Sequence, residues 1–278
     1  MNTVDLDPWE SFEKHVASIF VTWQKLKDEN KYNQWATPRF RGHLDADWKL
    51  ETTLERFTKK SVDTEHYFKM LRDIRPAVIS ITGRNWDIPD EFQGGRPQPL
   101  GYEFMIYLRH HGFPSPLLDW TRSPYVAAFF AFRSHEKPKN DKVAIYSYVE
   151  HFFNPEGFDG KAPTIYGLGP YAVTHKRHYA QQCEYSICQR RIDGSRYEYS
   201  SHETAVLAGN TAGGDPVTKY VLPASEREKV LKVLQRMNIT AFSLFGSEES
   251  LMETLAYQEI ETNPLMNGPE EGQSSSIL

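Results

Sequence analysis

The amino-acid sequence predicts an α+β fold, in which helices at the N-terminal end decorate a mixed or split β-sheet of about six strands. Apolar residues repeat with helical spacing through most of the first half of the chain. Runs rich in β-branched and aromatic residues, which favour strands, gather in the second half. This separation favours α+β over a regular βαβ alternation. We expect one domain over residues 1–262, with an N-terminal helix at 8–28 and a core at 39–262. The polar composition of residues 263–278 predicts a disordered tail.

Composition narrows the class of protein. The chain has 278 residues, 39% of them hydrophobic and 13% aromatic, which suffices for a sizeable packed core. Its net charge of −5 argues against a protein that binds nucleic acid through bulk charge. We find no apolar run of membrane-spanning length and no signal-peptide pattern, so we expect a cytoplasmic protein with no membrane partner. Cys183 and Cys188 would point to opposite faces of one strand, and we expect both thiols to be reduced.

The individual elements follow from periodicity and from start and stop signals. The expected helices span residues 8–28, 48–57, 64–81, 102–110, 124–132, 224–237 and 248–258. Pro76 should break or kink the third of them. The expected strands span residues 39–42, 117–121, 143–149, 178–189, 218–222 and 239–245, with 117–121 a buried strand end or a turn. Residues 83–99 and 151–175 are predicted as loops, and 193–216 as a hairpin insertion.

We expect the stretch from Tyr107 to Phe132 to organise the rest of the chain. Gly112 ends a helix, and Ser123 and Pro124 are typical of the cap and first position of the next helix. Asp119 is a carboxylate within an apolar run. It is either a structural acceptor for backbone N–H groups in the turn or a functional group.

Several kinds of chemistry lack support in the sequence. His110 and His111 lie near Glu103 and Asp119, but adjacent residues on a helix point about 100° apart, so both histidines cannot easily bind one metal ion. We find no ligand pair with metal-site spacing and predict no metal. A Ser123–His111–Asp119 triad lacks a nucleophile elbow, and there is no P-loop or dinucleotide fingerprint.

Two motifs carry a resemblance to a known family. Phe40-Arg41-Gly42 is followed by Trp48, and the run LLDWTRSP, preceded by HHGFP and followed by AAFFA, ends near Phe132. Together they resemble the signature of the FRG domain, a bacterial family named for its Phe-Arg-Gly motif. FRG-domain proteins resemble parts of phage-defence and toxin–antitoxin systems. The resemblance therefore implies a toxin or defence effector, with an antitoxin protein as a possible partner.

Three separated segments also resemble the Arg–Ser–Glu triad of ADP-ribosyltransferases. They are Arg41 at a strand end, Thr121-Arg122-Ser123 at a strand-to-helix junction, and Gln182-x-Glu184 where a loop enters a strand. The resemblance implies an ADP-ribosyltransferase-like fold with NAD as a substrate. Glu184 would be catalytic, Arg41 would bind the pyrophosphate, and Gly42 would allow close approach of the ligand. Thr121 and Ser123 would orient the ribose and the glutamate, and Gln182 would address the acceptor.

The chemistry of NAD cleavage gives these residue types a reason. Breaking the nicotinamide–ribose bond passes through an oxocarbenium-like state, as glycoside cleavage does, and a carboxylate stabilises that cation. Arginine holds a pyrophosphate through bidentate hydrogen bonds. On this hypothesis, Glu184→Gln abolishes NAD-dependent modification and leaves the fold intact, whereas Asp119→Ala destabilises the protein.

Cations and rings around Glu184 predict a nucleic-acid acceptor, with RNA favoured over protein. The cations are Lys176, Arg177, Arg190, Arg191 and Arg196, and the interleaved rings are Tyr171, His175, His178 and Tyr179. Backbone-binding cations and stacking rings are what single-stranded nucleic acid requires. Arg177 and Tyr179 are the first candidates for substrate binding.

A second hypothesis makes the protein a non-enzymatic ligand-binding or sensor module of a defence system. Here Arg41 pairs with Asp119 and locks the core, Ser123 only caps a helix, and Glu184 is a charge on an edge strand. The basic strand face is then neutralised by acidic neighbours.

Overall fold

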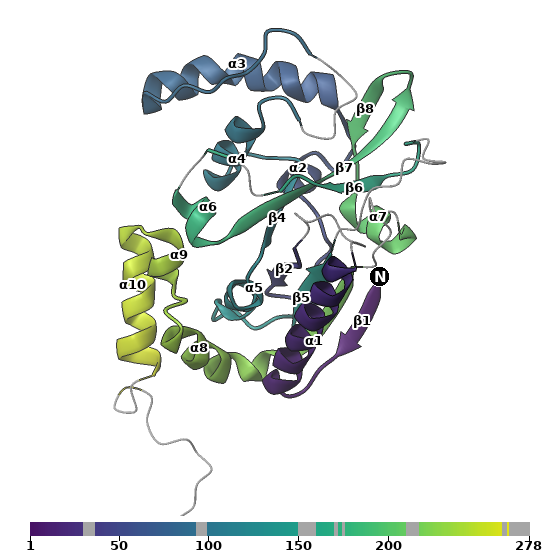
Figure 1. The fold of residues 1–278 in the computed structure, drawn as a ribbon. Coiled ribbons are helices and arrows are strands. Elements are labelled where there is room, and N and C mark those ends of the chain that lie inside the picture. Colours follow the sequence, from purple (N-terminus) through teal and green to yellow (C-terminus); the bar gives the residue numbers. More distant parts are fainter. Residues whose placement is uncertain are drawn as a thin grey trace, which may run out of the picture.

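The computed structural model describes residues 1–29, 37–92, 99–149, 160–169, 172–173, 176–209, 217–262 and 266. One mixed sheet runs through the middle of the molecule (Figure 1). Its strands are β1 (Asn2–Asp5), β2 (Arg39–His43), β3 (Val62–Asp63), β4 (Leu117–Thr121), β5 (Lys142–Tyr148), β6 (Thr164–Gly167), β7 (Cys183–Asp193), β8 (Arg196–Tyr199) and β9 (Thr218–Pro223). Their order is β1-β9-β5-β2-β4-β7-β8-β3, with β6 also paired to β7. β1 and β9 are parallel, and the other pairs are antiparallel. The α+β class and the mixed sheet are confirmed, with nine described strands in place of about six.

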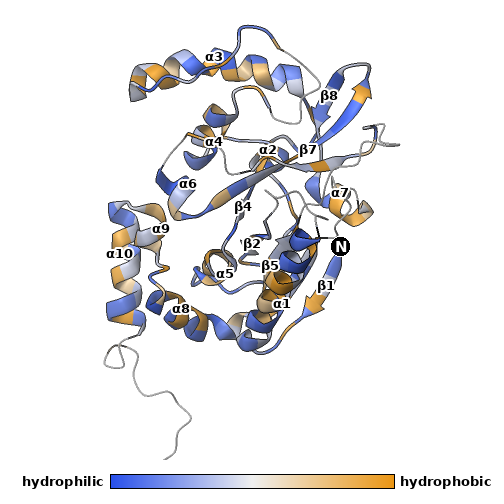
Figure 2. Ribbon diagram, in the orientation of Figure 1, coloured by the Kyte–Doolittle hydropathy of each residue, from blue (hydrophilic) through white to orange (hydrophobic). Residues whose placement is uncertain are grey.

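Helices cover the sheet on both sides. They are α1 (Trp9–Asp28), α2 (Thr53–Thr58), α3 (Thr64–Thr82), α4 (Tyr102–His110), α5 (Pro124–Phe132), α6 (Lys176–Ala180), α7 (His202–Ala208), α8 (Arg227–Arg236), α9 (Ala241–Phe245) and α10 (Glu248–Ala256). Two short turns, Ala224–Glu226 and Tyr257–Glu261, complete them. On one face, α1, α5 and α8 share an apolar cluster with β5 and β9, and α3 and α4 pack with β4 and β7. On the opposite face, α7 packs against residues of β4, β5 and β7. Apolar and polar residues alternate along α1 and α8 as expected for helices with one buried face (Figure 2).

Capping chemistry accounts for several of the helix boundaries. The Ser123 hydroxyl accepts the Val126 N–H at 3.2 Å and Pro124 follows it, as the sequence predicts for the start of α5. α3 continues through Pro76, so the predicted break is wrong. Asp63 caps its N-terminus and Gly83 ends it in the left-handed conformation, so both ends of the helix are stabilised.

The last predicted strand, residues 239–245, is wrong. In the structure, Thr240 and Ser243 form a capping box, and Gly246 in the left-handed conformation closes the short helix α9. The β-forming side chains of this segment are therefore overridden by helix signals at both of its ends.

Other boundaries also differ from the prediction. Residues 178–180 belong to α6, so β7 begins only at Cys183. The expected helix at 48–57 is reduced to α2, and the expected insertion at 193–216 contains β8 and α7. β1, β3 and β6 were not predicted. Part of the predicted loop at 151–175 lies outside the described residues, and so does the whole of the predicted tail at 263–278 except Met266.

The two cysteines lie on β7 as free, buried thiols. Cys183 packs in the cluster of α3 and α4, and Cys188 packs with residues of the opposite face, which confirms the alternation expected of a strand. Among the described helices, none has the length and apolar character needed to cross a membrane.

Candidate functional site

The three segments singled out from the sequence lie on adjacent strands, β2, β4 and β7. Phe40 pairs with Thr121, and Thr121 pairs with Cys183 on the next strand. Phe40, Thr121 and Cys183 thus form one row across the three strands, with Arg41 one residue after Phe40 and Glu184 one residue after Cys183. The fold therefore brings together segments far apart in the chain, but alternation along each strand decides which side chains share a face.

Gly42 is required by a helix, in addition to the close approach of a ligand for which the resemblance suggested it. A Cβ atom at this position would lie 1.9 Å from the carbonyl oxygen of Ala127 and 2.7 Å from the nitrogen of Ala131. Both are backbone atoms of α5, so this helix rests directly on β2. The small side chains of α5 and the glycine of β2 serve one helix–sheet contact.

Glu184 is buried in an ion pair behind that contact. Its side chain is 1% exposed, and its Oε2 atom accepts from Nε of Arg39. The hydroxyl of Thr37 donates to Oε1 at 3.1 Å, and the guanidinium carbon of Arg39 lies 5.6 Å from the centre of the Tyr148 ring. β7 has neighbours on both sides, so the interpretation of Glu184 as an edge-strand charge is wrong. Arg39, not Arg41, is its closest basic partner.

Arg41 contacts Asp119, as the second hypothesis expects. Its Nη1 donates to the main-chain oxygen of Asp119 at 2.8 Å and lies 4.0 Å from the carboxylate atom Oδ2. Its Nε donates to Nε2 of His43 at 3.0 Å. Burial lowers the pKa of Arg41 to about 10, with Asp119 opposing this shift and Arg109 and Arg56 adding to it. The guanidinium group is thus charged at neutral pH in surroundings that favour a nearby anion.

Asp119 takes its partner from α4. Its Oδ2 accepts from Nη2 of Arg109 at 2.5 Å, and Oδ1 is buried with no hydrogen-bond partner among the described residues. No described backbone N–H group donates to this carboxylate, so the structural role predicted for it in a turn is wrong. Asp119 lies within β4, where the sheet already satisfies the backbone groups.

A cavity of about 290 Å³ opens over Asp119. Its described walls include Arg41, Gly42, Asp119 and Thr121 from the sheet, Arg109 and His110 from α4, Phe130 from α5, Arg177 from α6 and Phe245 from α9. Three guanidinium groups surround the one carboxylate of this described lining, so the cavity suits an anionic ligand. Neither Glu184 nor Ser123 belongs to the lining.

Thr121, Ser123 and Gln182 support the strand-to-helix junction. Thr121 donates its hydroxyl to the main-chain oxygen of Gln181 at 2.7 Å and accepts the N–H of Ser123 at 3.1 Å. Gln182 is exposed and has a φ of 49°, a left-handed conformation at the turn before β7. The structure thus gives Ser123 and Thr121 local roles, while the Gln182 side chain stays available at the surface.

The basic residues predicted to bind the acceptor do not form one patch. Arg177 lines the cavity, and Tyr179 beside it is 73% exposed. Arg190, Arg191 and Arg196 lie at the far end of the β7–β8 hairpin.

Several of the predicted acceptor-binding residues already contact other residues of the fold. Arg190 pairs with Glu198, and Arg196 pairs with Asp193 and Asp63, as the second hypothesis expects of a neutralised face. His178 is buried and stacks on Tyr185. Tyr171 and His175 lie outside the described residues.

A second cavity, of about 570 Å³, was missed by the sequence analysis. It shares Arg41, Gly42 and Phe130 with the first, and it adds His43 and Trp48 to the lining. Burial, followed by the charge of Arg41, lowers the pKa of His43 well below its ordinary value, so this imidazole is neutral. The alternation Arg39, Arg41, His43 along β2 was the signal in the sequence that could have placed these side chains on one face.

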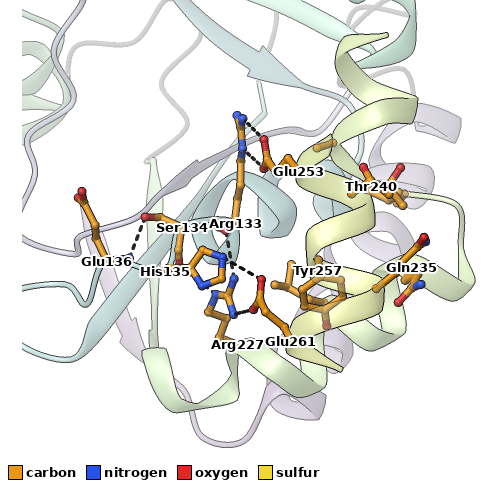
Figure 3. A pocket seen from close by; sticks show the side chains of 15 residues that line it. Arg133, Ser134, His135, Glu136, Arg227, Gln235, Thr240, Glu253, Tyr257 and Glu261 are labelled. Atoms are coloured by element: carbon orange, nitrogen blue, oxygen red, sulfur yellow. Dashed lines mark hydrogen bonds and ion pairs between the residues drawn. The ribbon is translucent and has the colours of Figure 1, made fainter. Parts of the chain in front are cut away.

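A third cavity, between α8 and α10, differs in charge (Figure 3). Arg133 makes two 2.6 Å hydrogen bonds to Glu253, and Arg227 donates to Glu261 at 2.7 Å (Figure 3). His135 also contacts Glu261, at 2.8 Å. Because carboxylates of the lining already pair with its cations, this cavity offers little attraction to an anion. Among the described residues, no group of three or more metal-ligating side chains gathers at one point.

Comparison with known proteins identifies one family. Neither curated proteins nor solved structures give a match to the chain. The family model of the FRG domain matches residues 36–140, a segment that contains β2, β4 and α5 together with Arg41 and Asp119. The three residues shared by the two basic cavities, Arg41, Gly42 and Phe130, therefore all lie within the matched segment. The motifs Phe40-Arg41-Gly42 and LLDWTRSP both lie within the segment that matches the FRG domain model, residues 36–140.

Proposed function

We propose that this protein is an NAD-dependent ADP-ribosyltransferase that acts as a toxin or anti-phage defence effector in the cytoplasm. The observation that carries the proposal is the adjacency of β2, β4 and β7, whose Arg41, Thr121 and Glu184 lie within one residue of a common row. The sequence resemblance predicted that these three segments cooperate, and their proximity in the sheet supports it.

The cavity over Asp119 supplies the groups that such a reaction needs. Arg41, Arg109 and Arg177 can bind the pyrophosphate of NAD through charge-assisted hydrogen bonds. A carboxylate facing the ribose stabilises the oxocarbenium-like cation while the nicotinamide leaves with the bonding electrons. The acceptor then forms the new bond to the ribose carbon and loses its proton.

The choice of carboxylate follows from burial. Asp119 lines the cavity, whereas Glu184 is closed off by Arg39 and Thr37. We therefore assign the ribose-facing role to Asp119. Glu184 remains the second candidate, but it could face the ribose only after its ion pair with Arg39 is broken. The Asp119 side chain is 29% exposed, so its carboxylate can accept from a ribose hydroxyl in the cavity.

We propose nucleic acid, and RNA in preference to protein, as the acceptor. Arg177 at the cavity wall and the exposed Tyr179 and Gln182 near it support this proposal, since a cation beside an exposed ring suits a single strand. An antitoxin protein is the expected regulatory partner of a toxin of this kind.

A second candidate, a non-enzymatic ligand-binding or sensor module, is favoured by the burial of Glu184. Its ion pair with Arg39 and the contact of Arg41 with Asp119 are both compatible with roles in the core. Such a module would bind an anionic ligand in the same cavity without cleaving it.

Incubation of the purified chain with NAD labelled in the adenylate phosphate, and with total RNA or lysate protein, tests the proposal. We expect nicotinamide release and label in RNA, both lost in Asp119→Asn and kept in Asp193→Asn, a control on the β7–β8 hairpin. Label only in protein bands would contradict the RNA acceptor alone. Thermal unfolding with NAD separates the candidates, because a ligand at 100 times its Kd adds about 2.7 kcal/mol of stability. Stabilisation without nicotinamide release would select the binding module.

A further inference from the structure

Two basic cavities meet at Arg41. One, of about 290 Å³, holds Asp119, and the other, of about 570 Å³, holds His43 and Trp48. Arg41, Gly42 and Phe130 are walls of both. Small-molecule sites span about 300–1,000 Å³, and a dinucleotide is larger than the drug-sized ligands at the lower end of that range. The cavity over Asp119 is therefore suited to one half of a dinucleotide.

The charge of the second cavity suits phosphate. Lys49 and Arg56 line it and form no ion pair among the described residues, whereas Arg133 is already paired with Glu253. Arg56 also adds to the positive charge that lowers the pKa of Arg41. An anion placed at Arg41 would relieve this repulsion between cations.

His43 holds Arg41 in the wall of the second cavity. Its side chain is buried, at 5% exposure, and lines this cavity. Its Nε2 accepts from Nε of Arg41, so in the neutral ring the proton lies on Nδ1. Nδ1 is buried beside the main chain of Trp48, so the imidazole fixes the position of the arginine and of the tryptophan.

Trp48 provides a stacking surface in the same cavity. It is 53% exposed, an unusual state for a large ring, and its ring centre lies 6.2 Å from that of His43. Exposed indole rings bind the faces of nucleobases. The described lining sets Arg41, Lys49, Arg56 and Arg133 against one carboxylate, Glu51. An aromatic face together with this excess of cations matches a nucleotide better than an isolated phosphate.

We propose that the cavity beside Trp48 is the adenosine subsite of a dinucleotide site that straddles Arg41. The pyrophosphate lies at Arg41, the adenine stacks on Trp48, and the second nucleoside occupies the cavity over Asp119. The assignment of that second half rests on the proposed NAD-dependent function. The adenosine subsite itself is defined by binding alone.

Calorimetric titration with AMP, ADP-ribose and inorganic pyrophosphate tests the subsite. We expect Trp48→Ala to weaken AMP and ADP-ribose binding about tenfold or more, since stacking of a base on a ring is worth that factor. Pyrophosphate binding should be unchanged in Trp48→Ala and reduced in Arg56→Gln. Phe57→Ala is the control, because this ring is 77% exposed and lines neither cavity.

The outcomes separate the subsite from the reaction. AMP binding that is absent in the wild type, or equal in the wild type and Trp48→Ala, overturns the subsite. Trp48-dependent binding of ADP-ribose together with no release of nicotinamide from NAD establishes the subsite and contradicts the transferase. Nicotinamide release with a KM for NAD unaffected by Trp48→Ala supports the transferase and contradicts the subsite.

Discussion

Two arginine–carboxylate pairs lie on opposite sides of the same strands, and they differ in burial. The side chains of Arg39 and Glu184 are 4% and 1% exposed, whereas those of Arg109 and Asp119 are 18% and 29% exposed. The first pair is closed by protein atoms, and the second opens on a cavity. A buried pair that loses one partner leaves an uncompensated charge, while an accessible pair can exchange its partner for a ligand or water. Burial, and not residue type, therefore separates the structural pair from the candidate functional one.

Strand alternation explains this division. Asp119 pairs across the ladder with Tyr185, and the next residue, Trp120, pairs with Glu184. Tyr185 belongs to the apolar cluster of α3 and α4, and Trp120 belongs to the cluster on the other face. Two carboxylates on neighbouring strands thus face different surroundings because their positions differ by one residue.

The largest expected effect is at the closed pair. Glu184→Gln removes the charge that compensates Arg39, so we expect a loss of about 3–5 kcal/mol in the free energy of unfolding. Because Glu184 is buried in an ion pair, this expectation replaces the prediction from the sequence that the substitution leaves the fold intact. Urea denaturation measures the change. Glu198→Gln is the control, because it breaks the more exposed pair with Arg190 and should cost about 1 kcal/mol or less. Equal losses of stability in the two variants would contradict the idea that burial makes the Arg39–Glu184 pair more important for stability than an exposed pair.

A methyl group at Gly42 tests the close contact of α5 with β2, on the face of the sheet that carries Asp119. Gly42→Ala would force α5 away from β2, because the new Cβ meets backbone atoms that cannot rotate aside. We expect a loss of about 1–3 kcal/mol, as for overpacked cores, and enlargement of the cavities that share this wall. Gly112→Ala is the control: it has open space around it and a φ of 86°, so only backbone strain of about 1 kcal/mol applies. A larger effect at Gly112 would contradict the close packing of α5.

The pH dependence of stability sharpens the comparison at His43. Burial and the charge of Arg41, with those of Lys219 and Arg56, lower the pKa of His43 in the folded state. The unfolded chain then binds a proton below about pH 6.5 that the folded chain does not bind. Stability is therefore lost as the pH falls below that value, by about 1.4 kcal/mol per pH unit while His43 stays neutral. Urea denaturation between pH 7 and pH 5 should give a smaller slope for His43→Gln than for the wild type. Identical slopes would mean that His43 is protonated in the folded protein.

Local signals made part of this arrangement predictable. The cap at Ser123, the start of α5 and the opposite-facing cysteines follow from neighbouring residues, and the sequence analysis placed them correctly. The partners of Glu184 and Asp119 depend on register between strands far apart in the chain, which periodicity does not encode. Asp119 was recognised as an unusual carboxylate, but its partner Arg109 belongs to a helix whose orientation no local pattern fixes.

The smallest expected change in stability is at the accessible pair, where the largest change in activity is expected. Asp119→Ala leaves Arg109 and Arg41 partly exposed, so water can replace the carboxylate, and we expect a loss of about 1 kcal/mol in the free energy of unfolding. Loss of a partner for a buried polar group costs about 1–3 kcal/mol, and partial exposure places the value for Asp119→Ala at the lower end. Nicotinamide release from NAD should fall by a factor of about 100–1,000, as when one stabilising group of a transition state is removed. Comparing the two quantities in Asp119→Ala and Glu184→Gln gives the decisive measurement. If Glu184→Gln, assayed below its unfolding transition, loses activity while Asp119→Ala keeps it, the buried carboxylate is the catalytic one, and Arg39 must release it when NAD binds.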